Sequence, residues 1–324
     1  MRSLIDISTP VGVWLTEELS LVSDVLFEHL INKHPDVNTL CHELATYKGK
    51  MLRPSLLLLS WRVLNPDTET PQSVRVAAGV VELIHLATLV HDDVLDEADL
   101  RRGARTINSL RGNEAAVMLG DYLLSSAFLL CSTIKNPDLN LLLGGVTNTL
   151  CAGEVVQLSN RNNMDLTQEQ YFQIIRDKTA SLIAASCEMG GVLGGGGEVQ
   201  IRVLREFGEK AGTAFQIKDD LLDLLEEESL VGKPVGRDVE KGKLTLPVIV
   251  FLQENPDKKS VLLDAMVYGN TKTLREILHG AGSVQVAIEC VNELVTSAVG
   301  GVVGEFEGPA VAQMCVMVEG LHTD

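Results

Sequence analysis

Residues 82–96 read ELIHLATLVHDDVLD, and residues 215–223 read FQIKDDLLD. Each stretch sets an Asp-Asp-x-x-Asp triplet in an apolar run with helical spacing. On an α-helix, positions i, i+1 and i+4 fall within about 100° of one another, so each triplet places three carboxylates on one helix face. The sequence therefore predicts two acidic helices, which carry Asp92, Asp93 and Asp96 and Asp219, Asp220 and Asp223.

Carboxylates clustered in this way raise one another's pKa and destabilise a fold unless cations bind them. Hard oxygen ligands with no nearby Cys or paired His favour Mg²⁺, which keeps several waters and completes its shell with substrate phosphates. One such helix by itself is more often a solvated or salt-bridged face. Two copies with matching cations favour Mg²⁺ ions held between the two faces.

Outward from the triplets, apolar residues recur at three- and four-residue spacing, as in Leu15, Leu19, Val22, Leu26 and Leu30. Asn-Gly and Asp-Gly hairpin turns are absent from the sequence, and strict alternation is rare. This periodicity predicts an all-α fold. No linker divides the chain, so we expect a single domain over residues 1–324.

The bulk composition is that of a globular protein, with 45% hydrophobic and 22% charged residues. We find no apolar run long enough to cross a bilayer and expect no transmembrane segment. The net charge of −17 argues against nucleic-acid partners. Six cysteines without a C-x-x-C pair, and an N-terminus without a signal peptide, favour a cytoplasmic protein.

Cationic segments alternate with the two acidic ones. Gly49-Lys50-Met51-Leu52-Arg53-Pro54 comes first, Arg101-Arg102 follows the first triplet, and Lys178-Thr179 and Gln216 precede the second. This ordered set resembles the trans-isoprenyl diphosphate synthases, the polyprenyl synthetase family, from about residue 45 to 250. Ala180 after Lys178-Thr179 and a C-terminus without a basic end depart from that pattern.

The resemblance implies an isoprenoid-synthase-type helical bundle around a central cavity and a Mg²⁺-dependent prenyltransferase. All six aspartates would bind the metal, and Asp92, Asp93, Asp96, Lys178, Asp219 and Asp220 would be the catalytic residues. The remaining implied roles concern the two substrates: Arg101, Lys178, Thr179, Gln216, Lys233 and Lys243 would bind the allylic diphosphate, and Lys50, Arg53, His85 and Arg102 would bind isopentenyl diphosphate. Without the resemblance, a core histidine explains His85 equally well.

The reaction implied is a head-to-tail condensation. Magnesium and fixed cations stabilise the departing diphosphate, and an allylic cation forms. The double bond of isopentenyl diphosphate attacks that cation, and loss of a proton regenerates an allylic product. Apolar flanks keep water from quenching the cation.

Product length is predicted from the residues one turn before the first triplet. In the family, bulky aromatics there close the product tunnel early, whereas this chain has Ala87 and Thr88. We therefore expect a long-chain all-trans polyprenyl diphosphate for quinone side chains, made by a homodimer that touches a membrane transiently during product release. A shorter farnesyl or geranylgeranyl product is the alternative.

Three other functions compete with this interpretation. A class I terpene cyclase needs no second-substrate site, so Lys50, Arg53 and Arg102 count against it. A non-catalytic partner subunit of a heteromeric prenyl synthase would be expected to have lost acids or cations, and none is missing. A metal-dependent phosphohydrolase site at the His91-Asp92 pair would require further His and Asp ligands and would leave the second triplet unused.

Overall fold

The computed structural model describes residues 5–47, 49–225, 238, 241–267 and 271–323. The chain forms two compact units. The first comprises Met1–Thr147, Leu182–Gly208 and Gly301–Gly320, and the second comprises Asn148–Ser181, Glu209–Gly300 and Leu321–Asp324. The single domain over residues 1–324 stays a prediction.

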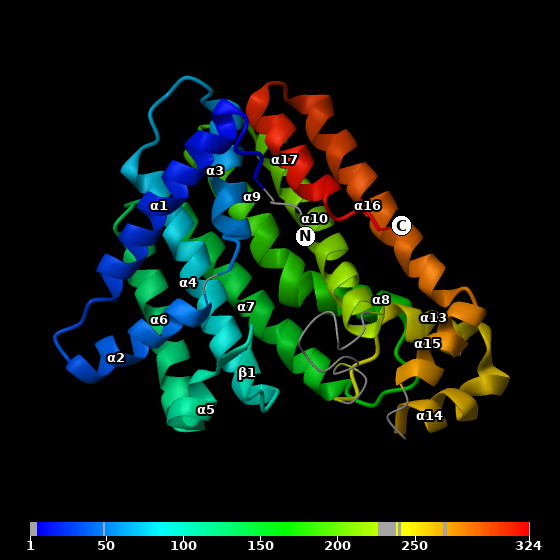
Figure 1. Cartoon of the computed structure of the whole chain (residues 1–324). Helices are drawn as coiled ribbons and strands as arrows, with labels where there is room; N and C mark the ends of the chain where they lie inside the picture. The colour runs from blue at the N-terminus through cyan, green and yellow to red at the C-terminus, as the bar shows by residue number, and fades with distance from the viewer. Residues whose placement is uncertain (1–4, 48, 226–237, 239–240, 268–270, 324) are drawn as a thin grey trace. The chain divides into compact units, whose positions relative to one another are not determined.

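Helices make up most of the described structure (Figure 1). The elements up to the middle of the chain are α1 (Pro10–Leu30), α2 (Pro35–Glu43), the 3₁₀ helix η1 (Leu44–Tyr47), α3 (Leu52–Leu64), α4 (Gln72–Leu95), β1 (Leu100–Arg101), β2 (Ala104–Arg105), α5 (Ile107–Arg111), α6 (Asn113–Ser132) and α7 (Pro137–Ser159). They are followed by α8 (Gln168–Ile175), the π-helix η2 (Arg176–Ala180), α9 (Ser181–Leu193), α10 (Glu198–Leu225), α13 (Leu246–Glu254), η3 (Pro256–Lys258), α14 (Lys259–Val267), α15 (Thr271–Gly280), α16 (Ser283–Glu305) and α17 (Pro309–Glu319). The predicted all-α class is confirmed.

Helix α4, which carries the first triplet, is the core of the first unit. It packs most extensively on α6 and then on α3 and α1 (Figure 1). Its residues 76–84 are all buried, and a helix that is apolar around most of its circumference belongs inside a protein. The helix ends at Leu95, and Asp96 is its C-cap. The first triplet therefore lies at the end of a rigid element.

A two-stranded hairpin follows the first triplet. Strand β1 pairs antiparallel with β2, with Leu100 opposite Arg105 and Arg101 opposite Ala104. The two loop residues, Arg102 and Gly103, have φ values of 52° and 80°, the left-handed conformation that a type I′ turn needs. The loop sequence is Arg-Gly, so the absence of Asn-Gly and Asp-Gly turns from the sequence did not indicate this hairpin.

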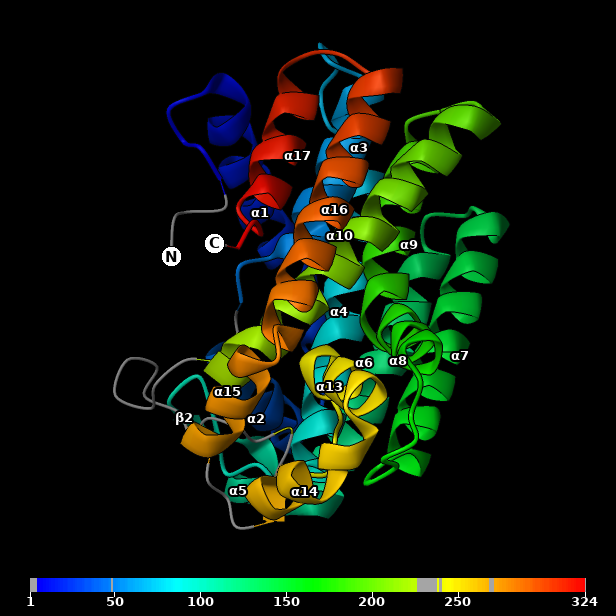
Figure 2. The same cartoon turned by 90° about the vertical axis from the view of Figure 1, so that its right-hand side faces the viewer.

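The second unit carries the second triplet on the last turns of α10. In this unit α15 packs against α13 and α14, and α13 packs against α8 (Figure 2). Helix α8 begins with a capping box between Thr167 and Gln170, in which each side chain bonds the other residue's backbone N–H. Helix α7 lies directly against η2 at Gly153, since a Cβ there would be 2.8 Å from the backbone nitrogen of Lys178.

The expectation that no apolar run reaches membrane-spanning length is wrong as a statement about length and composition. Helices α4, α6, α7 and α16 all have the length and hydropathy of a span. A helix of this hydropathy can contain a few charged residues, so the absence of an unbroken apolar run does not exclude it. In α4, 72% of the apolar window is buried inside the protein, so packing already uses most of its apolar surface.

Candidate functional site

The middle aspartate of the first triplet is enclosed. Asp93 is 2% exposed, and both of its carboxylate oxygens accept hydrogen bonds. Arg101 donates from Nε to Oδ1 (2.9 Å) and Oδ2 (3.1 Å) and from Nη2 to Oδ1 (2.8 Å). The Tyr47 hydroxyl donates to Oδ2 at 2.5 Å. Asp92 and Asp96 are partly exposed, so the three carboxylates have different surroundings.

The partners of Asp93 are themselves perturbed by it. Burial opposes the charge of Arg101, but the hydrogen bonds from Asp93 and the nearby charges of Asp93 and Asp92 outweigh it and raise the pKa of Arg101. Burial and the hydrogen bond to Asp93 raise the pKa of Tyr47. Arg101 is therefore a permanent cation and Tyr47 a neutral hydrogen-bond donor at the end of α4.

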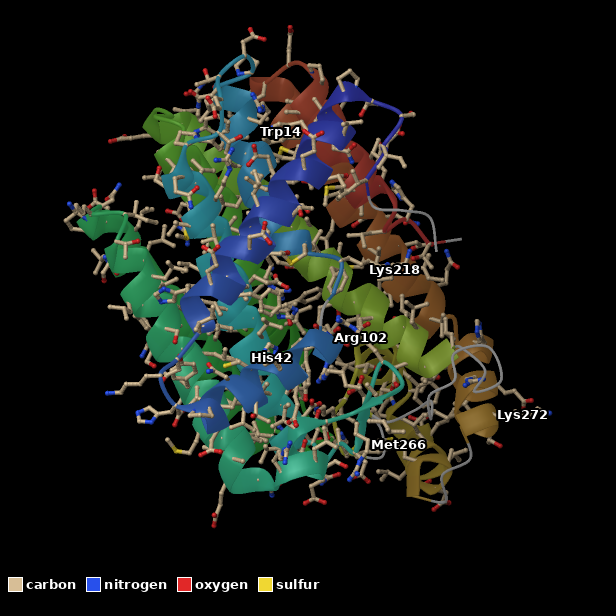
Figure 3. The ribbon with its side chains drawn as sticks, turned by 60° about the vertical axis from the view of Figure 1, so that its left-hand side comes forward. Trp14, His42, Arg102, Lys218, Met266 and Lys272 are labelled. Atoms are coloured by element: carbon tan, nitrogen blue, oxygen red, sulfur yellow. The ribbon has the colours of Figure 1, made fainter. Side chains whose placement is uncertain are left out.

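A second cationic group in the first unit involves Arg102, which lies in the hairpin loop (Figure 3). Its Nη1 donates to the backbone carbonyl of Tyr47 at 2.7 Å. A Cβ added at Gly49 would be 3.1 Å from both terminal nitrogens of the Arg102 guanidinium. The Gly49 backbone therefore lies against the Arg102 side chain. Lys50 itself is exposed just before α3.

Glu82 lies among these cations and was not assigned a role from the sequence. It is 4% exposed, and its Oε2, like the Nε of Arg53, is buried without a hydrogen-bond partner among the described residues. Burial raises the pKa of Glu82, and the charges of Arg53 and Arg102 oppose that effect. An incompletely satisfied group of this kind is costly in a fold and is often functional.

His85 is on the same helix as Glu82, one turn further on. Burial lowers the pKa of His85 well below 6.5, and the charges of Arg53, Arg102 and Arg101 lower it further. His85 is therefore neutral at physiological pH and offers a hydrogen bond without a charge.

The second triplet repeats the arrangement of the first. Asp220 is 7% exposed, and Asp219 is exposed. The Tyr171 hydroxyl donates to Asp220 Oδ2 at 2.6 Å, and Gln216 Nε2 donates to Oδ1 at 2.8 Å. Thr179 Oγ1 donates to Gln216 Oε1 at 2.8 Å. Burial raises the pKa of Asp220 strongly, and the hydrogen bonds from Tyr171 and Gln216 counteract it.

Asp223 and Lys243 are also in the second unit. The Oδ2 of Asp223 accepts the backbone N–H of Asp238 at 3.1 Å, and the backbone N–H of Lys243 donates to the carbonyl of Asp238 at 2.7 Å. Asp238 thus links the backbone of Lys243 to Asp223 of the second triplet. Lys233 lies outside the described residues.

Lys178 projects from the π-helix η2, a rare element that often marks functional sites. Its Nζ lies 2.5 Å from Glu154 Oε2 and donates to Gln157 Oε1 at 2.9 Å. Two residues of α7 therefore hold the lysine in place.

The two residues predicted to set chain length differ in their surroundings. Ala87 is fully buried, whereas Thr88 is partly exposed and donates from Oγ1 to the backbone carbonyl of His85 at 2.8 Å. Leu83 and Ile84, one turn earlier, are fully buried.

The first unit thus bonds Asp93 of the first triplet to Arg101 and places Arg53 and Arg102 near both Glu82 and His85. The second unit joins Asp220 to Gln216 and Thr179. No cluster of three or more His, Cys, Asp or Glu side chains suited to a metal occurs in the part of the chain that the structure describes. Sequence reasoning missed Tyr47, Tyr171, Glu82 and Glu154. Only Glu82 had a usable signal, its helical spacing from His85.

Comparison with known proteins relates the whole arrangement to one family. Residues 34–279 match the sequence model described as Polyprenyl synthetase. The octaprenyl diphosphate synthase of Escherichia coli is 33% identical over 261 residues, 80% of each chain. A short chain isoprenyl diphosphate synthase of Methanothermobacter thermautotrophicus is 36% identical over 242 residues, 72% of this chain and 73% of that one. The crystal structure of a decaprenyl diphosphate synthase from Rhodobacter capsulatus superposes with a TM-score of 0.89 at 30% identity, covering 96% of this chain and 97% of that one.

Proposed function

The chain belongs to the polyprenyl synthetase family of prenyltransferases, and from this membership we propose that it joins isopentenyl diphosphate to an allylic diphosphate to make a long-chain trans-polyprenyl diphosphate. The observation that carries the proposal is the hydrogen-bonded ion pair between Asp93, on the last turn of α4, and Arg101 of strand β1. In the same unit, Arg53 and Arg102 are close enough for their charges to act on both Glu82 and His85. The carboxylates with Arg101 would bind one diphosphate, and the separate cations would bind the other.

We propose Mg²⁺ as the cofactor, held by the two triplets. The donor set fits, since it consists of carboxylate oxygens, and Asp92 and Asp96 at i and i+4 lie on one side of the helix. Asp219 and Asp223 have the same spacing. Asp93 and Asp220 complete the proposed set. Bound Mg²⁺ would act as a Lewis acid that neutralises the leaving diphosphate.

The cations divide between the two substrates. Arg101, oriented by Asp93, would bind the allylic diphosphate together with Lys178, whose position Glu154 and Gln157 fix. Further contacts would come from Thr179, Gln216, Lys233 and Lys243. The diphosphate of isopentenyl diphosphate would meet Lys50, Arg53 and Arg102, while neutral His85 donates a hydrogen bond. Because the chain carries a net charge of −17, these local cations must supply the attraction for anionic substrates.

The product would be long because the residues beside the growing prenyl chain are small. A helix rises about 1.5 Å per residue, so Ala87 and Thr88 lie roughly one turn before the first triplet. Neither side chain is large enough to block a growing prenyl chain there. Similarity to a short chain synthase favours a shorter product as the second candidate.

Ala87→Phe tests this assignment. The larger phenyl ring would block the path proposed for the growing prenyl chain, so we expect the product to shorten by several isoprene units. Radiolabelled products separated by reversed-phase chromatography provide the measurement, with Leu141→Phe at an exposed position of α7 as the control. An unchanged product length in Ala87→Phe would show that this position does not limit growth.

We also propose a homodimer in the cytoplasm that contacts a membrane transiently when it releases product. Support for a dimer comes from α6, which exposes Val117, Met118 and Leu129 at 40%, 62% and 64%. Large exposed apolar side chains on one helix are typical of subunit interfaces.

The function is tested by assaying the purified chain alone with Mg²⁺, isopentenyl diphosphate and allylic diphosphates of increasing length. We expect consumption of both substrates and a limit product well beyond fifteen carbons. A fifteen-carbon limit product would support the second candidate. Consumption of the allylic substrate alone, or no turnover, would contradict the proposed synthase.

A further inference from the structure

We propose that Tyr47 and Tyr171 are matched positioning residues: each hydroxyl fixes the buried middle aspartate of one triplet, and that aspartate in turn orients a diphosphate-binding side chain. The side chain oriented is Arg101 in the first unit and Gln216 in the second. This inference rests on the proposed function.

The two arrangements have the same geometry although their tyrosines come from different elements. Tyr47 ends the 3₁₀ helix η1 and reaches Asp93 Oδ2 at 2.5 Å, and Tyr171 lies on α8 and reaches Asp220 Oδ2 at 2.6 Å. The two phenols are 1% and 2% exposed and their aspartates 2% and 7%. Short bonds from a hydroxyl to a buried carboxylate are among the strong hydrogen bonds in proteins.

In each unit the other carboxylate oxygen holds the side chain that would meet phosphate. Arg101 donates twice to Asp93 Oδ1 and once to the oxygen that Tyr47 contacts. A carboxylate held only by a long arginine can rotate with it, whereas a rigid phenol at its second oxygen fixes its plane. The plane of the guanidinium then follows from the bidentate pair.

In the second unit the chain of contacts is longer but ends in the same way. Thr179 occupies the Oε1 of Gln216, which directs the amide Nε2 to Asp220. Tyr171 holds the opposite oxygen of that carboxylate. Removing the phenol would free Asp220 to turn and take Gln216 with it.

A substitution of Tyr47 can distinguish effects on the allylic diphosphate from effects on isopentenyl diphosphate. Its hydroxyl serves Asp93 and also accepts the backbone N–H of Ile107 at 3.2 Å, whereas its backbone carbonyl accepts Arg102. Tyr47→Phe removes only the hydroxyl. The allylic diphosphate site should therefore lose the hydrogen bond that orients Asp93. Arg102, assigned to isopentenyl diphosphate, should keep its bond to the backbone carbonyl of residue 47.

The experiment compares Tyr47→Phe and Tyr171→Phe with Tyr122→Phe, a control that removes a hydroxyl bonded to Asn32 and Leu30. Calorimetry measures the binding of inorganic pyrophosphate in the presence of Mg²⁺, and kinetics give the KM of each substrate. We expect both test variants to weaken pyrophosphate binding about tenfold and to raise the allylic KM similarly. The KM of isopentenyl diphosphate should change less than about twofold in Tyr47→Phe. Tyr122→Phe should match wild type.

Two results would overturn the inference: pyrophosphate binding unchanged in both variants, or a parallel rise in both KM values, which a general loss of structure would cause. If Tyr47→Phe does not fold, fluorotyrosine at position 47 keeps the ring and changes only the hydroxyl donor. It must then alter pyrophosphate binding while fluorotyrosine at 122 does not. A wild-type chain without turnover would refute the proposed function, yet weaker pyrophosphate binding by the two variants would still support the positioning role.

Discussion

At the scale of single residues, Gly49 lies against the guanidinium of Arg102, which leaves little room for a side chain. A Cβ there would be 3.1 Å from two nitrogens of Arg102, so alanine would push the arginine by a few tenths of an ångström and strain its 2.7 Å bond to the Tyr47 carbonyl. We expect Gly49→Ala to raise the KM of isopentenyl diphosphate about threefold to tenfold, since a displaced hydrogen bond costs about 1 kcal/mol. Steady-state kinetics with each substrate varied will show this. The control is Gly197→Ala, where the nearest atom would be 3.9 Å away. Equal KM values in both variants would contradict the assignment.

At the scale of elements, the contact between α7 and η2 positions Lys178. A Cβ on Gly153 would be 2.8 Å from the Asp177 Cβ and from the Lys178 backbone nitrogen, and backbone cannot move aside as a flexible side chain can. We expect Gly153→Ala to displace the π-helix, to lower the free energy of unfolding by about 1–3 kcal/mol and to reduce turnover at least tenfold. Denaturant melts and kinetics provide the measurements. On the same helix, Gly144→Ala meets no atom within 4 Å and should leave stability equal or higher. Matching behaviour of the two variants would contradict a tight α7–η2 contact.

At the scale of the whole molecule, the burial of His85 near three arginines makes the free energy of unfolding depend on pH. The pKa of His85 is lowered well below 6.5 in the native protein, first by burial and then by Arg53, Arg102 and Arg101. Below pH 6.5 the unfolded chain therefore binds a proton that the native protein does not, and the free energy of unfolding falls as pH decreases. Each pH unit costs at most about 1.4 kcal/mol. Urea melts from pH 7 to about 5, above the range of most carboxylates, should show a shallower loss for His85→Gln. The exposed His42→Gln (Figure 3) should keep the wild-type slope. An unchanged slope in His85→Gln would refute this origin.

The all-α class and the order of acids and cations follow from the sequence alone, because helical spacing determines which residues share a face, as it does for Asp92 and Asp96. Helical spacing alone does not distinguish Asp93 and Asp220 from the other aspartates of their triplets. Only the tertiary structure distinguishes them, since it buries both middle aspartates against Tyr47 and Tyr171, which are 46 and 49 residues away in the chain. The same holds for the Arg102-Gly103 loop and the π-helix around Lys178. Periodicity reports on neighbours along one element, whereas a hydrogen bond between elements leaves no periodic trace and arises only when packing brings its donor and acceptor together.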